Sequence, residues 1–177
     1  KGSALVDPAQ LAWGLKRVCL ELGVQIFEQS PVRSLAKSGN GVEVETDGGT
    51  VSAAKVALAT NVFPSLLRRA RLHTVPVYDY ALMTEPLTAA QRQAIGWDNR
   101  QGVGDMANQF HYYRQSADGR ILFGGYDAVY HYGGKVRSAY EHRPATYRTL
   151  ASHFLTTFPQ LEGIGFTHRW AGAIDTS

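Results

Sequence analysis

Aromatic and guanidinium side chains are concentrated in residues 109–130. The six aromatic residues of this stretch are Phe110, Tyr112, Tyr113, Phe123, Tyr126 and Tyr130, and Arg114 and Arg120 lie among them. A sheet face packed against a helix would account for this composition. The wall of a small-molecule pocket would account for it equally well, because such pockets combine aromatic surface with a few polar groups.

The same stretch predicts the element that would hold these side chains. Two runs rich in β-branched and aromatic residues, 109–115 and 120–123, flank Ala117-Asp118-Gly119. Asp-Gly between such runs is a strong hairpin signal, because glycine accepts the positive φ of a tight turn. Gly124-Gly125 would then let the backbone pass close to a bulky group. We therefore expect a β-hairpin beside a ligand or a large side chain.

Composition is that of an ordinary globular protein. The 177 residues are 44% hydrophobic and 19% charged, which is enough for one domain with a core or for parts of two. No run of about 18 apolar residues occurs, so we expect no membrane partner. The net charge of +3 comes from scattered basic residues, so we expect no nucleic-acid partner. The single cysteine, Cys19, excludes an internal disulfide and fits a cytoplasmic location, and we expect it to be buried and inert.

Helix and strand signals alternate through the first part of the chain. Asp7-Pro8 is a helix start, an apolar stripe follows at helical spacing, and Gly23 supplies a left-handed stop. Residues 24–28 and 55–60 read as strands, the second apolar enough to be buried on both faces. Alternating apolar residues at 42–46 lead into Asp47-Gly48-Gly49 and predict a hairpin, and residues 65–71 look helical.

The pattern of secondary-structure signals changes after residue 74. Residues 75–84 predict a long strand of a largely antiparallel sheet, and Thr88 with Gln91 predicts a capped short helix that ends at Gly96. Pro144 begins a helix, and residues 167–174 form a last strand. The helix carries one apolar face, made of Tyr147, Leu150, Phe154 and Phe158. The predicted fold class is α/β, more closely α+β, with a mostly antiparallel sheet and flanking helices.

Motifs that would identify a reaction directly are missing from the sequence. There is no G-x-S-x-G, no H-E-x-x-H, no G-x-G-x-x-G after a strand and no phosphate-binding P-loop. The S-x-x-K at Ser34 lacks the companion motifs of penicillin-recognising enzymes. The six histidines never fall at metal-ligand spacing, so we expect polar-network roles for them and no metal. The residues alone predict a ligand-binding α/β domain and no catalytic residue.

Short motifs follow one another in a fixed order along almost the whole chain: Ala4-Leu5-Val6-Asp7-Pro8, Gly23-Val24, Pro31-Val32, residues 56–61, residues 118–125, Phe158-Pro159-Gln160-Leu161 and residues 168–172. This ordered set resembles the D-amino-acid oxidase-like family of FAD-dependent oxidoreductases. Within that family it is most similar to the branch of γ-glutamylputrescine oxidoreductase and glycine or sarcosine oxidase-like members.

The resemblance implies that this chain is the interior of a longer enzyme. Residues 1–73 would be the second, incomplete segment of the FAD-binding domain, residues 74–169 the substrate-binding domain, and residues 170–177 a truncated return strand toward the FAD domain. The Gly-rich turn that binds the pyrophosphate of FAD would precede the chain. We therefore expect the chain alone to hold FAD poorly, to be inactive, and to offer exposed strand edges for self-association.

The resemblance also implies roles for particular residues. Cofactor contacts would fall on Val32, Ala59, Thr60, Asn61, Ala171 and Gly172. The substrate would meet Tyr112, Arg114, Tyr126 and Trp170. The implied reaction oxidises the C–N bond of a small-molecule amine or amino-acid-like substrate: hydride passes from the carbon beside the neutral amine to flavin N5, which gives an imine that water hydrolyses.

Two departures from the family pattern bear on this reaction. Members that oxidise amino acids carry an Arg for the substrate carboxylate where this chain has Ile174, so an amine or a polyamine derivative is favoured over an α-amino acid. Sarcosine oxidase-like members carry a Lys that assists reaction with oxygen where this chain has Phe123, which leaves another electron acceptor open. Which amine is oxidised stays open at this point. The alternative function is a stand-alone binding or interaction module that reuses the substrate domain without flavin.

Overall fold

The computed structural model describes residues 4–63 and 65–176, and their contacts divide the chain into two units. Unit 1 comprises Lys1–Thr60 and Pro64–Arg68, and unit 2 comprises Asn61–Phe63 and Arg69–Ser177. The domain boundaries implied by the resemblance concern a longer protein and stay a prediction. Each unit is described by itself.

Unit 1 begins with the predicted helix, α1 (Pro8–Glu21). The Asp7 carboxylate accepts hydrogen bonds from the backbone N–H groups of Ala9 and Gln10, each at 3.0 Å, and so satisfies two donors of the first turn. At the other end Gly23 has φ +83°, and the Val24 N–H donates to the Cys19 carbonyl at 2.9 Å. This left-handed ending explains why the helix stops where the glycine stands.

The predicted hairpin is confirmed as part of a small antiparallel sheet. β1 (Val32–Ser38), β2 (Gly41–Thr46) and β3 (Gly49–Ala53) pair in that order, and β1 was not predicted. The strands expected at residues 24–28 and 55–60 are wrong, because both segments lack regular secondary structure. An extended segment becomes a strand only when a neighbour satisfies its N–H and C=O groups, and no described strand pairs with either one.

Two further expectations for this part of the chain need correction. The helix expected at residues 65–71 is instead a 3₁₀ turn, η1 (Arg68–His73). Cys19 is half-buried rather than buried, because the face of α1 on which it lies is largely exposed in unit 1.

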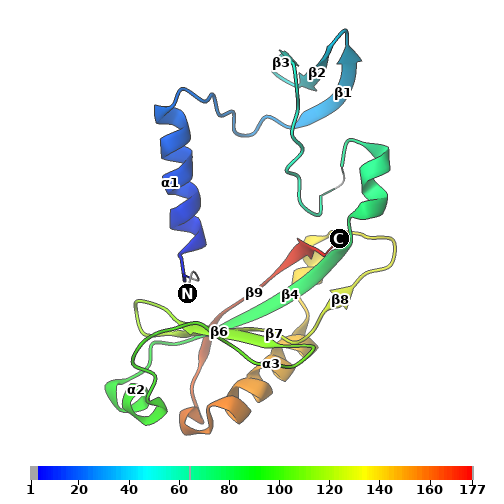
Figure 1. The fold of residues 1–177 in the computed structure, drawn as a ribbon. Helices are drawn as coiled ribbons and strands as arrows, with labels where there is room; N and C mark the ends of the chain where they lie inside the picture. The colour runs from blue at the N-terminus through cyan, green and yellow to red at the C-terminus, as the bar shows by residue number, and fades with distance from the viewer. Residues whose placement is uncertain (1–3, 64, 177) are drawn as a thin grey trace. The chain divides into compact units, whose positions relative to one another are not determined.

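Unit 2 is built around one central strand, β4 (Pro76–Thr84), which lies at the middle of an antiparallel sheet (Figure 1). β9 (Phe166–Asp175) pairs with β4 along its whole length. On the other edge of β4, β7 (Ile121–Gly125) and β8 (Val129–Tyr130) pair with successive parts of the strand. β6 (His111–Gln115) pairs with β7, and β5 (Val103–Gly104) pairs with β6. The long strand, the central hairpin and the last strand are thus confirmed.

Helix α3 (Pro144–Thr157) covers one face of this sheet (Figure 1). Tyr80, Phe123 and Phe154 are completely buried between helix and sheet. The helix and its predicted apolar face are confirmed, since Tyr147, Leu150 and Phe154 are buried and Phe158 packs against the same core. The remaining helical elements are α2 (Ala89–Ile95), which has the predicted capping box and ends at Gly96, η2 (Ser138–Glu141) and η3 (Pro159–Leu161).

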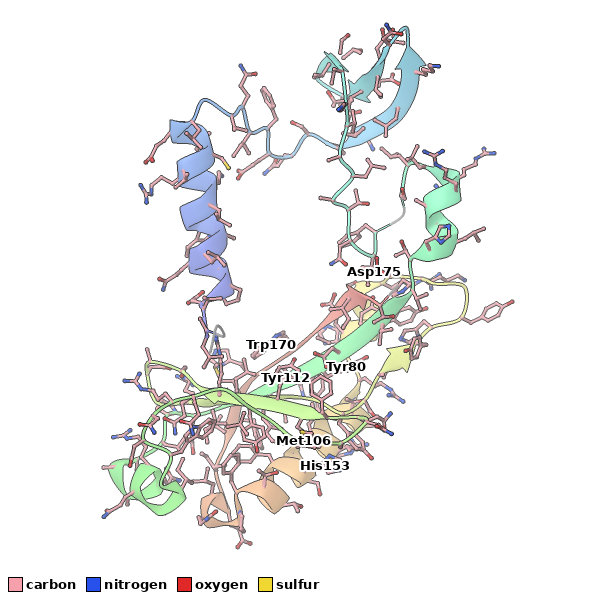
Figure 2. The ribbon with its side chains drawn as sticks, in the orientation of Figure 1. Tyr80, Met106, Tyr112, His153, Trp170 and Asp175 are labelled. Atoms are coloured by element: carbon pink, nitrogen blue, oxygen red, sulfur yellow. The ribbon has the colours of Figure 1, made fainter. Side chains whose placement is uncertain are left out.

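The second face of the sheet, here called the open face, carries a different set of side chains. It comprises Val77, Asp79, Ala81 and Met83 on β4, His168, Trp170, Gly172 and Ile174 on β9, Leu122 and Gly124 on β7, and Tyr112 and Arg114 on β6. These residues are direct cross-strand partners or alternate along one strand, so their side chains share a side. Trp170 is 42% exposed and lies on the side of the sheet away from α3 (Figure 2).

No helix within the described residues is both long enough and apolar enough to span a bilayer.

Candidate functional site

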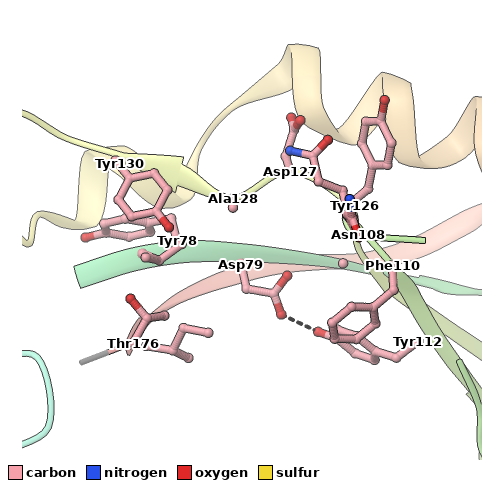
Figure 3. A pocket seen from close by; sticks show the side chains of 14 residues that line it. Tyr78, Asp79, Asn108, Phe110, Tyr112, Tyr126, Asp127, Ala128, Tyr130 and Thr176 are labelled. Atoms are coloured by element: carbon pink, nitrogen blue, oxygen red, sulfur yellow. Dashed lines mark hydrogen bonds between the residues drawn. The ribbon is translucent and has the colours of Figure 1, made fainter. Parts of the chain in front are cut away.

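A hollow of about 200 Å³ opens at one end of the open face (Figure 3). Strands β4, β6 and β9, together with the segments before β6 and after β7, supply its walls. The lining residues are Val77, Tyr78, Asp79, Asn108, Gln109, Phe110, Tyr112, Gly125, Tyr126, Asp127, Ala128, Tyr130, Ile174 and Thr176. Aromatic rings and two carboxylates are present among them, and no Lys, Arg or His is.

Asp79 and Tyr112 form the polar centre of this hollow (Figure 3). The Tyr112 hydroxyl donates a hydrogen bond of 2.6 Å to Asp79 Oδ2. Asp79 Oδ1 accepts a second hydrogen bond, of 3.0 Å, from the Tyr80 backbone N–H. Burial of the phenol raises the pKa of Tyr112 well above its usual value, and the neighbouring Asp79 carboxylate raises it further. Tyr112 therefore stays a neutral donor at any ordinary pH.

Two glycines on β7 make room for this arrangement. A Cβ at Gly124 would lie 2.6 Å from Cζ of the Tyr112 ring, so a side chain there would displace the phenol. At Gly125, which has φ +98°, a Cβ would lie 2.3 Å from the Phe110 carbonyl oxygen. The expectation that Gly124-Gly125 passes close to a bulky group is confirmed, and the bulky group is Tyr112 itself.

Tyr126 lines the hollow and also contacts the imidazole rings of His111 and His153. Its ring stacks on His111 with centroids 5.3 Å apart and meets His153 edge-on at 4.4 Å. His111 Nδ1 lies 2.6 Å from Asp105 Oδ2, and His111 Nε2 lies 2.9 Å from His153 Nδ1. The hydrogen bond from His111 is the main reason why the pKa of Asp105 is lowered. Because an ionised carboxylate only accepts, the hydrogen of the contact between Asp105 and His111 lies on His111 Nδ1.

Asp127, the second carboxylate of the lining, already has a hydrogen-bond donor and a basic partner within the protein. Its Oδ2 accepts a hydrogen bond of 2.6 Å from the Thr146 hydroxyl and lies 3.4 Å from an Arg143 guanidinium nitrogen. Both partners belong to the start of α3, so Asp127 fastens the segment after β7 to that helix. Its charge is compensated in place.

The predicted substrate residues are only partly brought together. Tyr112 and Tyr126 line the hollow, whereas Arg114 and Trp170 lie outside it on the same open face of the sheet. Asp79 was missed. The available signal was a single charged residue within the otherwise apolar strand Pro76–Thr84.

The predicted cofactor residues fall in both units. Val32, the first residue of β1, lines a hollow of about 490 Å³ in unit 1 together with Phe27 and Val44. Ala59 and Thr60 are exposed in unit 1 and have no regular secondary structure, and Asn61 is exposed with φ +49°. On β9, Ala171 packs toward the core, so only its backbone is free to meet a ligand at the open face, whereas Gly172 belongs to that face.

The sequence matches one protein family along its whole length. Residues 1–177 match the family model described as FAD dependent oxidoreductase. A probable oxidoreductase, OrdL, of Haemophilus influenzae is 35% identical over 98% of this chain. The γ-glutamylputrescine oxidoreductase of Escherichia coli is 30% identical over 94% of it. The family resemblance seen in the motifs is thereby confirmed.

A solved structure shares the fold. The L-proline dehydrogenase of P. horikoshii superposes with a TM-score of 0.78 over 97% of this chain and 44% of its own, at 20% identity. This similarity confirms the mixed α and β fold class. The chain spans 38% of the length of the Haemophilus protein and 37% of the length of the Escherichia protein.

Proposed function

The chain belongs to the FAD dependent oxidoreductase family, and on that premise we propose that it is a segment of an enzyme that oxidises the C–N bond of an amine. The segment supplies the substrate-binding sheet and part of the cofactor-binding domain. Because the phosphate-binding turn of FAD is not among its motifs, the segment alone is inactive or weakly active.

The lining of the hollow is the observation that carries this proposal. Aromatic rings from Phe110, Tyr112, Tyr126 and Tyr130 surround it, and no basic side chain lines it. A substrate carboxylate would need a cation there, because carboxylates are bound by forked hydrogen bonds from Arg or by Lys. Ile174, where the resemblance expects Arg, lies in the lining instead. The substrate is therefore an amine rather than an α-amino acid.

The open face suits a planar cofactor. A Cβ at Gly172 would meet nothing within 4 Å, and the indole of Trp170 is 42% exposed on the same face. Gly172 pairs directly with Asp79 across β9 and β4, so a ring held near Gly172 would lie next to the amine hollow. When bound, FAD supplies the acceptor for a hydride leaving the carbon beside the amine nitrogen, and the resulting imine is hydrolysed by water.

The chain's own residues bind and orient the substrate. The aromatic walls exclude water and hold the alkyl chain of the amine, so that one C–H bond keeps a fixed direction. Tyr112 keeps its proton, since its pKa is raised, and so continues to hold Asp79 in place during a turnover.

The residues of strand β7 indicate which kind of electron acceptor reoxidises the flavin. Phe123 is completely buried toward α3, so its ring does not reach the open face. The neighbouring positions that do face that side, Leu122 and Gly124, are both apolar. No lysine stands in β7 to assist oxygen, and we propose an acceptor other than oxygen.

Anaerobic reduction tests the proposed function. The full-length protein that carries this chain is purified with FAD and mixed without oxygen with a primary amine, a secondary amine, an α-amino acid and an alcohol of matched carbon skeleton. The expected result is loss of the visible absorbance of oxidised flavin with an amine and little change with the amino acid or the alcohol. Absorbance that persists with every amine, while dithionite still bleaches it, would refute the proposal and favour a binding module.

A further inference from the structure

We infer that His111 is a positioning residue of the hollow, which fixes residues 105–110 as the wall against which the substrate binds. The inference rests on the proposed function and gives a role in it to a histidine that does not touch the substrate. Loss of this histidine should weaken binding of the amine and leave the transfer of hydride nearly unchanged.

Residues 105–110 join β5 to β6 and have no regular secondary structure. Three of them, Asn108, Gln109 and Phe110, line the hollow. All six residues are exposed, and Met106 is completely so, which means that little side-chain burial holds the segment in place. The position of this wall therefore depends on polar contacts at its two ends.

His111 joins those two ends. Its Nδ1 donates a hydrogen bond of 2.6 Å to Oδ2 of Asp105, the first residue of the segment, and its backbone carbonyl accepts one of 3.1 Å from the Asp105 N–H. Asp105 Oδ1 in turn accepts from the Ala107 N–H at 3.1 Å. At the last residue of the segment, the Phe110 carbonyl accepts a hydrogen bond of 2.9 Å from the Tyr126 N–H. Asp105 and His111 thus close the segment into a loop.

The same imidazole fastens the loop to helix α3. His111 Nε2 lies 2.9 Å from Nδ1 of His153, which belongs to α3. The His111 side chain is only 13% exposed, and its ring stacks on Phe123 and on Tyr126 with centroids 4.9 Å and 5.3 Å apart. Hydrogen bonds at both nitrogens and these ring contacts hold the imidazole in one position. One side chain therefore anchors the wall of the hollow to the core of unit 2.

His111 acts on the hollow without touching its contents. It precedes Tyr112 on β6, and successive side chains of a strand point to opposite faces of the sheet. Tyr112 belongs to the open face, whereas His111 meets His153 on the face that α3 covers. Neither histidine is among the described residues that line the hollow. The pair consequently positions the wall and does not exchange a proton with the substrate directly.

The number of hydrogens in these contacts makes the anchor sensitive to pH. His111 Nδ1 carries a hydrogen toward Asp105, and one further hydrogen lies between His111 Nε2 and His153 Nδ1. When both rings are protonated, two N–H groups face each other and this contact is lost. Asp105, which can balance one imidazolium, and Tyr126 are the titratable groups that contact the two rings within the described residues. Acidification therefore releases the wall from α3.

Hydrogen exchange of the full-length, flavin-loaded protein tests the anchor without turnover. His111→Phe keeps an aromatic ring in the stack and removes both side-chain hydrogen bonds. We expect the amides of residues 105–110 to exchange at least about tenfold faster in this variant, the effect of losing a hydrogen bond to a charged group. His142→Phe, at an exposed histidine, is the matched control and should exchange as the wild type. Should His111→Phe fail to fold, Asp105→Ala, at a side chain that is 36% exposed, removes the same anchor and should give the same change.

Rapid mixing without oxygen then separates binding from chemistry. The rate of flavin reduction is measured against the concentration of butylamine, which gives an apparent Kd and a limiting rate. We expect His111→Phe to raise the Kd about tenfold and to keep the limiting rate within about twofold of the wild type. Acidification from about pH 8 to about pH 5, over which histidines gain their charge, should raise the Kd of the wild type more steeply than that of His111→Phe.

The outcomes separate this inference from the proposed function. Unchanged exchange in His111→Phe, or a lower limiting rate at an unchanged Kd, would overturn the inference even if amines bleach the flavin. So would Kd values that follow the same pH profile in the wild type and the variant. Faster exchange in a protein whose flavin no amine reduces would refute only the proposed function.

Discussion

The hydrogen bond from Tyr112 to Asp79 joins two residues that are 33 positions apart in the sequence. It depends on strand register, because Tyr112 pairs with Gly124 and Gly124 pairs with Ala81, two residues along β4 from Asp79. The missing side chain at Gly124 lets the phenol cross β7 to reach the carboxylate. The geometry of the site is therefore set by a glycine that touches no ligand.

The raised pKa of Tyr112 gives a prediction at this scale. The folded state holds the phenolic proton to higher pH than the unfolded state, whose tyrosines titrate with a pKa of ~10. The contribution to stability is therefore complete below pH ~10 and is lost as the pH rises further. In an alkaline absorbance titration, Tyr112→Phe should remove one late-ionising phenol.

Tyr132→Phe is the matched control, because Tyr132 is 99% exposed. That variant should keep the late step. A late step that is as large in Tyr112→Phe as in the wild type would show that burial and Asp79 do not act on this phenol.

Residue types predicted part of the site. Tyr112 and Tyr126 stand in an aromatic stretch that is visible in the sequence, and both line the hollow. Asp79 comes from another segment, β4, and only the register of the sheet brings it alongside Tyr112. The cluster of Asp105, His111 and His153 was missed for the same reason, since 42 positions separate the two histidines.

At the scale of elements, the sequence correctly predicted the features that depend on a few neighbouring residues. The caps at Asp7 and Thr88 and the turn at Gly119 formed as expected, because each acts over a few residues. The strands expected at residues 24–28 and 55–60 did not form, because a strand depends on a neighbour that no local pattern supplies.

Helix α3 should dominate the stability of unit 2. Phe154 is completely buried and packs edge-on against Phe123 and Phe166. Phe154→Ala should lower the free energy of unfolding by about 3–5 kcal/mol, through lost burial and the cavity left behind. Urea unfolding followed by tryptophan fluorescence measures this, since Trp97 stacks on Phe158 in the same core.

Leu155→Ala on the same helix provides the comparison. Leu155 is 37% exposed, so its truncation should cost well under half as much. Similar losses for the two variants would mean that α3 does not anchor the sheet through Phe154.

At the scale of the whole molecule, the ordered motifs identified the family. Unit 1 exposes an apolar stripe on α1, where Leu15 is 58% and Leu22 is 78% exposed. In the longer protein proposed above, such a stripe would be covered by other parts of the FAD-binding domain. The chain's 38% share of the length of its Haemophilus relative accords with that proposal.

The central claim is that amine oxidation takes place against the open face of the sheet in unit 2, with the cofactor beside Gly172. The most direct test is the rate of anaerobic flavin reduction by an amine in Gly172→Ala, with Gly104→Ala as the control. A Cβ at Gly172 meets no protein atom within 4 Å, and one at Gly104 makes only an ordinary contact at 3.6 Å, so both variants should fold. The account predicts that Gly172→Ala alters the flavin absorbance spectrum and slows reduction at least about tenfold, as a small displacement of reacting groups does, while Gly104→Ala matches the wild type. Spectra and reduction rates that are the same in all three proteins would contradict it.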